Sequence, residues 1–422
     1  MSYPAVQIRG QALNFVRGNT LPIESRSMSL TLLFDLDDTL LDTNLDSFIP
    51  AYFQALSKHL SARVSPNEMI HALVLGVNRM NETNDPTLTL QEVFDADFFP
   101  RLGVPKRELV QALDDFYDNI FPTLGSLTHP RPDAAPLIEW ALAQGFRVAL
   151  ATDPLFPRKA TLHRARWAGL DPEKFALISS YENFHFTKTY PAYYAEVLGQ
   201  MGWHEGPILM VGNDVKRDLE SAHRLGLKTY FVTTEPGSGP GFEAGCGTLA
   251  DLRPWLESVN LPALEPSYQS PESVLAMMSS VPAVLQSLTN ELTEAQWNHE
   301  PARGVWAMNE IVCHLRDTER EIHQLQLDLM LEREDPFIPR PDTSVWANER
   351  EYLSENGFTA LSEFASARLA NIEKLRDLDA AVWSRRARHA IFGPTNFLEV
   401  TRFLTDHDRM HIQQAWKTLK QL

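Results

Sequence analysis

Two aspartates follow the first strongly apolar segment of the chain, and their spacing would allow them to act together in catalysis. The apolar residues 32–34 lead directly into Asp35, and Asp37 comes two positions later. Because side chains alternate along a strand, Asp35 and Asp37 are expected on the same side. One carboxylate could then attack a substrate while its neighbour moves protons, with both near one divalent cation. The alternative is a turn acid with a helix cap, since Asp-Asp-Thr at 37–39 also suits that role.

Further segments place polar side chains after short apolar runs. In an open α/β sheet, ligands bind outside the carboxyl ends of the strands, so these side chains are expected to converge. Carboxylate oxygens suit magnesium, whereas Lys and Thr suit phosphoryl oxygens. The set predicts a phosphate-and-magnesium site. Its members are Thr152, Lys188, Asn213, Asp214 and Asp218.

These segments resemble, in order and spacing, the four motifs of the haloacid dehalogenase superfamily, over roughly residues 28–259. The resemblance implies a Rossmann-like parallel α/β sheet, with Asp35 as a nucleophile that forms an aspartyl-phosphate. It also implies that Asp37 protonates the leaving oxygen and then activates water, while Thr152 and Lys188 hold the phosphoryl group. Family members that cleave carbon–halogen bonds generally lack the second acid. Asp37 therefore favours a phosphatase acting on a small phosphorylated metabolite.

The resemblance also implies a magnesium ion, held by both acids of the first motif and by the fourth motif. That motif usually begins Gly-Asp, whereas this chain has Asn213 after Gly212. Asn213 would then take the usual ligand position, with Asp214 or Asp218 supplying the charge. A second departure is Asp153, which stands where Asn is commoner and puts another acid near a site meant for an anion.

Residues 44–127 separate the first two motifs and are expected to be helical, because apolar residues recur there at helical spacing. An insert at this point resembles the helical cap of the family, which closes over the site and excludes water. The alternative is a helical decoration without a gating role. Arg79, Asn81 and Tyr117 are candidates for the pocket lining, or else for solvated surface.

The composition narrows the class of protein. A chain of 422 residues is expected to form two or three units. Its net charge of −17 disfavours a nucleic-acid partner, and no apolar run approaches a membrane span. The first 27 residues lack the features of a signal peptide, and Met28 is a candidate for the natural start. With only two cysteines, Cys246 and Cys313, a disulfide framework is excluded in practice and a reducing cytoplasm is expected.

Prolines recur between residues 261 and 271, and this pattern predicts a linker between two domains. The glycine-rich stretch 237–241 lacks the Lys-Ser/Thr ending of a P-loop and is expected to be a surface loop. The predicted organisation is a tail (1–27), a catalytic core (28–43 and 128–259), a helical cap (44–127), a linker (260–271) and a four-helix bundle (272–422).

The C-terminal part has no strand signature, and four amphipathic patterns predict the all-α bundle. They span residues 272–292, 305–333, 358–377 and 396–420. His407 and His411 lie one turn apart on the apolar stripe of the last helix, so both imidazoles could reach one metal. His314 is also expected to point inward. One inward histidine is more often a hydrogen-bonded core residue, but three in one small bundle favour a metal site.

The segments 293–319 and 407–411 resemble the second-helix entry and final-helix signature of DinB-like bundles, and the resemblance extends over essentially all of 272–422. It implies that His314, His407 and His411 bind a divalent transition metal such as Zn²⁺ or Ni²⁺, with positions left for water or substrate. Some members of that family resemble thiol-dependent transferases or metal-dependent hydrolases. A low-molecular-weight thiol is therefore a candidate partner, and a homodimer is plausible. Cys313 is expected to be a buried, inert thiol.

Three functional assignments remain open at this point. The favoured one is a magnesium-dependent phosphatase fused to a metal-binding bundle. In the second, the bundle is the main enzyme, a metal-dependent thiol S-transferase or hydrolase. In the third, the bundle is a non-catalytic binding or dimerisation module.

Overall fold

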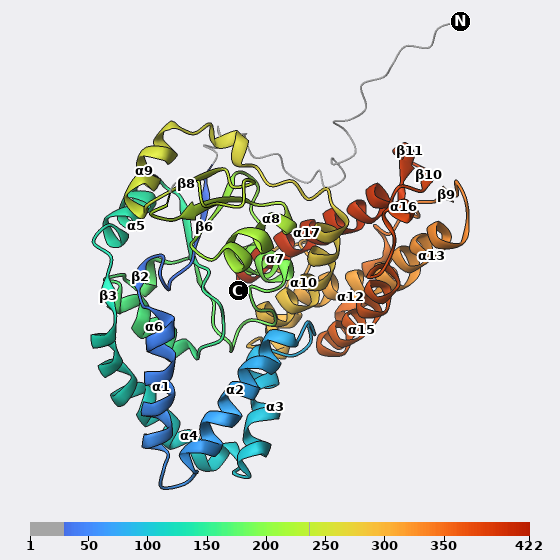
Figure 1. The fold of residues 1–422 in the computed structure, drawn as a ribbon. Helices are drawn as coiled ribbons and strands as arrows, with labels where there is room; N and C mark the ends of the chain where they lie inside the picture. The colour runs from blue at the N-terminus through green and yellow to red at the C-terminus, as the bar shows by residue number, and fades with distance from the viewer. Residues whose placement is uncertain (1–28, 236) are drawn as a thin grey trace, which may run out of the picture.

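The computed structural model describes residues 29–235 and 237–422; the predicted tail 1–27 and the candidate start at Met28 lie outside them. Figure 1 shows a sheet covered by helices, a helical cap extending from one end of it, and a helical bundle at its side. The predicted fold class, an α/β sheet with a helical cap followed by a helical bundle, is confirmed. Among the described residues, no helix combines the length and apolar content needed to cross a membrane.

A six-stranded parallel sheet forms the centre of the first part, in the order β5-β4-β1-β6-β7-β8. Every residue of β1 is buried, as expected for an apolar strand covered on both faces. Phe34 pairs with Leu150 on one side and with Val211 on the other, so the ends of these three strands meet at one edge. The strands are β1 (Thr31–Phe34), β4 (Arg147–Leu150), β5 (Leu177–Ile178), β6 (Ile208–Gly212), β7 (Lys228–Val232) and β8 (Gly245–Gly247).

Helices cover both faces of this sheet. Leu32 and Phe34 belong to the apolar cluster beneath α5 and α9, whereas Leu33 belongs to the cluster beneath α7 and α8, as the alternation of strand side chains requires. The helices are α5 (Ala134–Ala143), α6 (Arg158–Trp167), α7 (Pro191–Gln200), α8 (Ser221–Leu225) and α9 (Leu249–Ser258), with a 3₁₀ turn η3 (Pro172–Lys174) and a π-helical segment η4 (Val215–Glu220).

The predicted insert 44–127 is helical throughout most of its length. It leaves and rejoins the core at a two-stranded antiparallel ribbon, β2 (Leu41–Asp42) and β3 (His129–Pro130). The backbone N–H of Leu90 donates to the carbonyl of Phe184 at 2.8 Å, which fastens the cap to the core loop ahead of α7. The cap contains α1 (Leu45–His59), α2 (Pro66–Glu82), α3 (Leu90–Leu102), α4 (Lys106–Asp115), η1 (Phe116–Ile120) and η2 (Phe121–Leu127).

The C-terminal part contains the four predicted long helices, the second of them interrupted by a π-helical turn. They are α10 (Pro271–Thr289), α12 with η6 and α13 (Met308–Thr318, Glu319–His323 and Gln324–Glu332), α15 (Gly357–Leu375) and α17 (Phe397–Leu419). Shorter pieces are η5 (Leu261–Leu264), α11 (Glu294–Trp297), α14 (Trp346–Glu349), η7 (Tyr352–Ser354) and α16 (Ala380–Trp383).

The expectation that this part has no strands is wrong. A small three-stranded sheet joins β9 (Phe337–Ile338), β10 (Arg386–His389) and β11 (Gly393–Asn396). Its strands have two to four residues each, too few to show a clear alternation in the sequence. The hairpin of β10 and β11 leads directly into α17, the helix that carries two of the three inward histidines.

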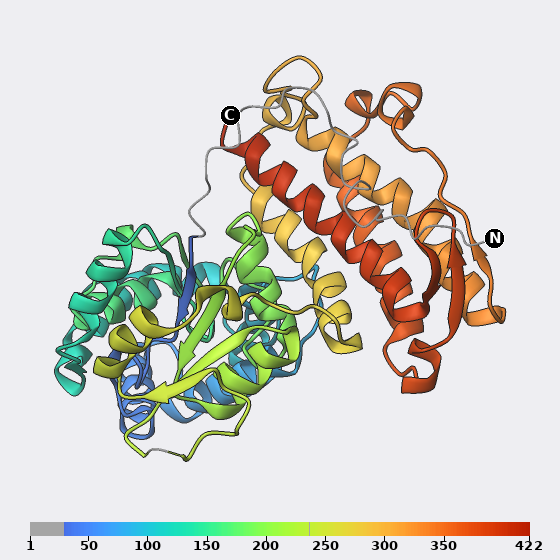
Figure 2. The same cartoon turned by 90° about the horizontal axis from the view of Figure 1, so that it is seen from above.

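The bundle and the sheet share one apolar core. Helix α10 lies along α7, and buried residues of both belong to one continuous cluster. Figure 2 shows the bundle, coloured orange to red, beside the green helices of the sheet. The predicted linker is held against the core as well, because Leu264 is buried and the Ser267 N–H donates to the Gly226 carbonyl at 2.9 Å.

Candidate active site and histidine cluster

Asp35, Lys188 and Asp218 meet at the carboxyl edge of the sheet. Asp35 directly follows β1, Lys188 comes from the loop before α7, and Asp218 lies in η4 after β6. The Lys188 Nζ lies 2.5 Å from Asp35 Oδ1 and 2.7 Å from Asp218 Oδ1. All three residues are buried. Gly212 makes room for this arrangement, since a Cβ at that position would overlap the Asp218 carboxylate.

Burial and charge act against each other in this cluster. Burial by itself would lower the pKa of Lys188, but the carboxylates of Asp218 and Asp35 outweigh it and hold that pKa above its usual value. Burial raises the pKa of Asp218, and the neighbouring Lys188 only partly offsets the rise. The ammonium therefore stays charged between two carboxylates, which is suited to binding an anionic phosphoryl group.

Asp37 is held by Thr43 and Arg164, two residues that the sequence did not indicate. The Thr43 hydroxyl donates to Asp37 Oδ1 at 2.7 Å, and the Arg164 guanidinium forms an ion pair with the other oxygen. Arg164 is buried, and its guanidinium lies 4.3 Å from the centre of the Phe156 ring. Burial lowers the pKa of Arg164 to about 10, so it stays charged at neutral pH.

The fourth motif divides its residues between the site and the helix that follows. Asn213 accepts a hydrogen bond from the Thr39 hydroxyl at 2.8 Å, next to the first motif. Asp214 is exposed, and its carboxylate caps η4 by accepting from the N–H groups of Lys216 and Arg217 at 2.9 and 3.0 Å. Of the two acids that were expected to supply the charge, Asp214 or Asp218, it is Asp218 that shares the Lys188 ammonium with Asp35.

Thr152 and Asp153 follow β4 at the same edge. The Thr152 carbonyl accepts from the hydroxyls of Ser179 (2.6 Å) and Tyr193 (2.8 Å), which anchors this loop. Asp153 forms an ion pair with Arg217 and accepts from the Lys188 N–H at 3.2 Å. Burial raises the pKa of Asp153, with Arg217 and Lys188 opposing that rise. The ion pair with Arg217 offsets the charge of Asp153, so this additional acid need not repel an anionic substrate.

The donor atoms at this edge fit a magnesium ion. Asp35, Asp37 and Asp218 supply carboxylates and Asn213 a carbonyl oxygen, which are the hard ligands that Mg²⁺ prefers. Burial raises the pKa of Asp218, and the nearby Asp35 carboxylate adds to the rise, so the ionised form of Asp218 is disfavoured. A divalent cation bound there would favour the ionised form.

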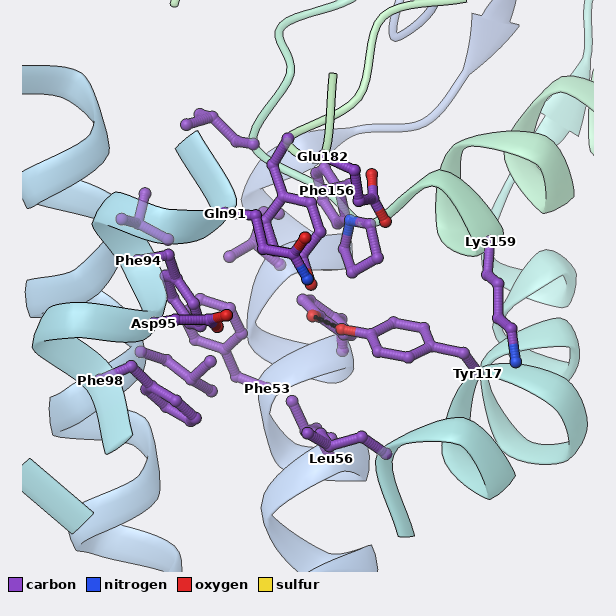
Figure 3. A pocket seen from close by; sticks show the side chains of 18 of the residues that line it. Phe53, Leu56, Gln91, Phe94, Asp95, Phe98, Tyr117, Phe156, Lys159 and Glu182 are labelled. Atoms are coloured by element: carbon purple, nitrogen blue, oxygen red, sulfur yellow. Dashed lines mark hydrogen bonds between the residues drawn. The ribbon is translucent and has the colours of Figure 1, made fainter. Parts of the chain in front are cut away.

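A cavity of about 630 Å³ lies between the cap and this edge of the sheet. Figure 3 shows side chains from several cap helices and from the core directed into it, Tyr117 among them. Of the three predicted pocket residues, Asn81 and Tyr117 line the cavity. Arg79 does not line it and is exposed.

The three predicted histidines of the bundle come together. His314 of α12 and His407 and His411 of α17 offer ligand nitrogens that all lie within 4.8 Å of one another. The Nε2 atoms of His314 and His407 are 3.2 Å apart. Two nitrogens bound to one tetrahedral zinc at about 2.0–2.1 Å would be roughly 3.3 Å apart. The spacing therefore fits ligands of one ion.

The protonation states agree with a metal site. Burial lowers the pKa of each of the three histidines, to about 3 for His411, and the neighbouring imidazoles add to the effect for His314 and His411. They are therefore neutral, which is the form that binds a metal. His411 Nδ1 lies 2.9 Å from Gln414 Oε1, a contact that orients the ring and leaves Nε2 free. Trp306 stacks on His411 with an interplanar angle of 5°.

A buried charged network beside this cluster was missed in the sequence. The Arg368 guanidinium donates to Glu319 at 2.7 and 2.9 Å and to Asp408 at 2.7 Å. His323 Nδ1 lies 2.9 Å from Glu319, and the His323 ring stands edge-on to His407 with centroids 5.4 Å apart. The position of Asp408 next to His407 was the signal that could have indicated it. Arg368 and Glu319 come from other helices and offer no comparable pattern.

Cys313 is buried, and burial raises the pKa of its thiol to about 12. It therefore stays protonated at neutral pH, in agreement with the inert thiol expected from the sequence. Cys246 is exposed, and both cysteines are free.

Comparison with protein families matches residues 30–226 to the haloacid dehalogenase-like hydrolases and residues 277–415 to the DinB superfamily. The chain joins a haloacid dehalogenase-like hydrolase region to a DinB-like region. Both predicted resemblances are thus confirmed, and the hydrolase region contains all the motif residues described above. The comparison with curated proteins gave no match.

Solved structures resemble the two regions separately. A haloacid dehalogenase-type phosphatase from Thermococcus onnurineus is 20% identical over 54% of this chain and 98% of its own, with a TM-score of 0.38. A 2-haloacid dehalogenase from Pseudomonas syringae pv. Tomato DC3000 is 20% identical over 55% and 98%, with a TM-score of 0.40. The four-helix bundle protein YfiT from Bacillus subtilis is 19% identical over 36% and 88%, with a TM-score of 0.34. Similarity at this level does not distinguish one hydrolytic reaction from another.

Proposed function

We propose that this protein is a magnesium-dependent phosphatase that hydrolyses a small phosphomonoester through an aspartyl-phosphate on Asp35. The observation that carries the proposal is the buried contact of Lys188 Nζ with Asp35 and Asp218, at 2.5 and 2.7 Å. A cation there can hold the phosphoryl oxygens against the attacking carboxylate. The matched hydrolase family supports the reaction class.

The residues divide the reaction into two steps. Asp35 attacks phosphorus, the bond from phosphorus to the ester oxygen breaks, and Asp37 gives its proton to that oxygen as the alcohol leaves. A water then attacks the phosphorus of the aspartyl-phosphate while Asp37 takes its proton, and inorganic phosphate and the free Asp35 carboxylate result. Lys188 and Thr152 steady the phosphoryl oxygens in both steps.

Asp35, Asp37, Asn213 and Asp218 are the residues that would hold magnesium. The ion would neutralise charge on the phosphoryl oxygens. We assign no ligand role to Asp214, because its carboxylate is used in capping η4.

A second activity is favoured by the histidine cluster. His314, His407 and His411 would hold a divalent transition metal, which supplies Lewis-acid chemistry or an activated water when it is bound. This supports the alternative in which the bundle is itself an enzyme, a hydrolase or a thiol S-transferase. The use of a thiol, the identity of the metal, a homodimer and a cytoplasmic location remain predictions.

The first test is phosphate release from a panel of phosphomonoesters with magnesium, comparing the wild type with Asp35→Asn and with Asp42→Asn. Asp42 is exposed and lies close by in β2, so it controls for loss of charge. We expect magnesium-dependent release that falls by roughly 10³-fold or more in Asp35→Asn and persists in Asp42→Asn. Release from no ester by the wild type would overturn the proposal.

A further inference from the structure

The cap cavity begins at the proposed reaction centre. Asp37, Asp153 and Arg217 form one side of its lining, and the rest comes from the cap helices and from the core segments 155–159 and 181–182. This inference rests on the proposed role of Asp37 as the acid that protonates the leaving oxygen. Because that oxygen must lie at Asp37, the group attached to it has to occupy the cavity.

The cavity wall is mainly aromatic and aliphatic. Phe53 of α1, Phe94 and Phe98 of α3 and Phe156 of the core contribute rings to it (Figure 3). Phe94 and Phe98 stack with centroids 4.7 Å apart and an interplanar angle of 24°. Such a wall favours flat or bulky apolar groups, which gain from leaving water and from contact with rings.

Each lysine or arginine of the lining is already paired with an aspartate of the lining. Lys106 contacts Asp95 at 2.5 Å, Lys159 contacts Asp114 at 2.9 Å, and Arg217 pairs with Asp153. Within the described part of the chain, the lining therefore offers no unpaired lysine or arginine. A substrate with a carboxylate or a second phosphate in its leaving group would lose hydration there without gaining a cation.

Hydrogen-bonding groups also stand within this wall. Asn78, Asn81 and Gln91 line it, and so does a pair of tyrosines. The hydroxyls of Tyr52 and Tyr117 are 2.7 Å apart, and since one of them donates, the proton of the accepting hydroxyl is left for another partner. Burial raises the pKa of Tyr52 to about 12 and that of Tyr117 well above its usual value, so both phenols stay neutral. The pair can meet an ether, carbonyl or hydroxyl oxygen on an otherwise apolar ligand.

We infer that the cap cavity binds an uncharged, bulky, ring-containing leaving group, and that the substrate class is the phosphomonoester of an aromatic or polycyclic alcohol. Esters whose leaving group carries a carboxylate or a second phosphate fit the wall poorly. The reaction products are the free alcohol and inorganic phosphate.

The test compares three esters of primary alcohols, so that the leaving groups differ mainly in shape and charge. They are 1-naphthylmethyl phosphate, glucose 6-phosphate and 2-phosphoglycolate, each with magnesium. We expect kcat/KM for the naphthylmethyl ester to exceed both others by roughly 100-fold. Equal or greater kcat/KM with glucose 6-phosphate or 2-phosphoglycolate would overturn the inference while leaving the phosphatase proposal intact.

Two variants test whether the apolar cavity wall causes the preference for the naphthylmethyl ester. Phe53→Ser should lower kcat/KM for the naphthylmethyl ester about 10-fold or more and leave that for 2-phosphoglycolate unchanged. Val74→Ser is the matched control, since Val74 is an exposed apolar residue of the cap that does not line the cavity. An equal loss with all three esters in Phe53→Ser would contradict the inference.

A binding measurement tests the cavity assignment independently of phosphatase activity. Calorimetry with Asp35→Asn should show binding of 1-naphthylmethyl phosphate that is weakened by adding Phe53→Ser and unaffected by adding Val74→Ser. If the wild type hydrolyses no ester but this binding pattern is found, the phosphatase proposal fails and the cavity assignment stands. If the naphthylmethyl ester does not bind, the cavity assignment is wrong.

Discussion

Gly199 of α7 lies directly against Val284 of α10, with no room for a side-chain carbon between the two helices. A Cβ at position 199 would overlap one methyl group of Val284 and come within 3.0 Å of the other. Helix α7 begins three residues after Lys188, so the bundle packs against the element that follows the phosphoryl-binding residue. Deleting the bundle would therefore expose the apolar side of α7 rather than simply remove an independent module.

The first prediction concerns this contact. Gly199→Ala should lower the free energy of unfolding by about 1–3 kcal/mol, because overpacking outweighs the gain in helix propensity. Val284→Ala should restore part of that loss in the double variant, since it removes the methyl groups in the way. Urea unfolding of the two single variants and the double variant measures the coupling. Additive effects of the two substitutions would contradict the close contact.

The main residues of the active site could be predicted because ligands bind at the carboxyl ends of parallel strands. Asp35 and Thr152 follow strands directly or within two residues, and parallel strands bring their ends to one edge. Asp214 shows the limit of this reasoning. It follows β6 by two residues, as Thr152 follows β4, but whether its carboxylate turns inward or caps the next helix depends on local backbone geometry.

The residues that the sequence did not reveal act through distant partners. Arg164 pairs with Asp37 across more than a hundred positions, and Arg368 reaches Glu319 and Asp408 from a third helix. A basic side chain on a helix is usually solvated, so nothing in the local pattern marks these two as buried. The helices of the bundle were predictable because their periodicity is local.

The second prediction tests Arg164. Arg164→Met should lower kcat, because the Asp37 carboxylate loses the buried ion pair that holds it in position for proton transfer. Arg164→Lys should restore kcat in part.

Arg166→Met is the control for this prediction, since Arg166 is exposed on the same helix. Removing one member of a buried ion pair also costs stability, roughly 3–5 kcal/mol, so rates are compared below the unfolding temperature of each variant. A kcat for Arg164→Met that matches the wild type would show that Arg164 does not position Asp37.

The third prediction concerns the metal of the bundle. Protein supplied with zinc should bind about one equivalent at this cluster, and His411→Ala should lose it because two ligands remain. Removing the metal with a chelator should lower the melting temperature of the wild type but not that of His411→Ala. A ligand present at about 100 times its Kd stabilises the folded protein by roughly 2.7 kcal/mol, and calorimetry detects the resulting shift in melting temperature.

His299→Ala is the control for this prediction. It alters an exposed histidine and should behave as the wild type. Equal zinc content in all three proteins would rule out the site.

The fourth prediction is the acid sensitivity of the bundle. Burial acts to raise the pKa of Glu319, but Arg368 and His323 outweigh it and lower that pKa from 4.5 to about 2. Because the folded-state pKa is depressed, the ionised carboxylate contributes stability that is fully present above pH 4.5 and is lost as the pH falls towards 2.

Glu319→Gln cannot gain or lose this proton, so its free energy of unfolding should fall less steeply between pH 4.5 and 2 than that of the wild type. Above pH 4.5 the variant should be the less stable protein, because Arg368 keeps only Asp408 as an ionised partner. Urea unfolding at several pH values, with a chelator present throughout, isolates this effect from metal loss. Parallel stability curves for the two proteins would mean that Glu319 has the same pKa folded and unfolded.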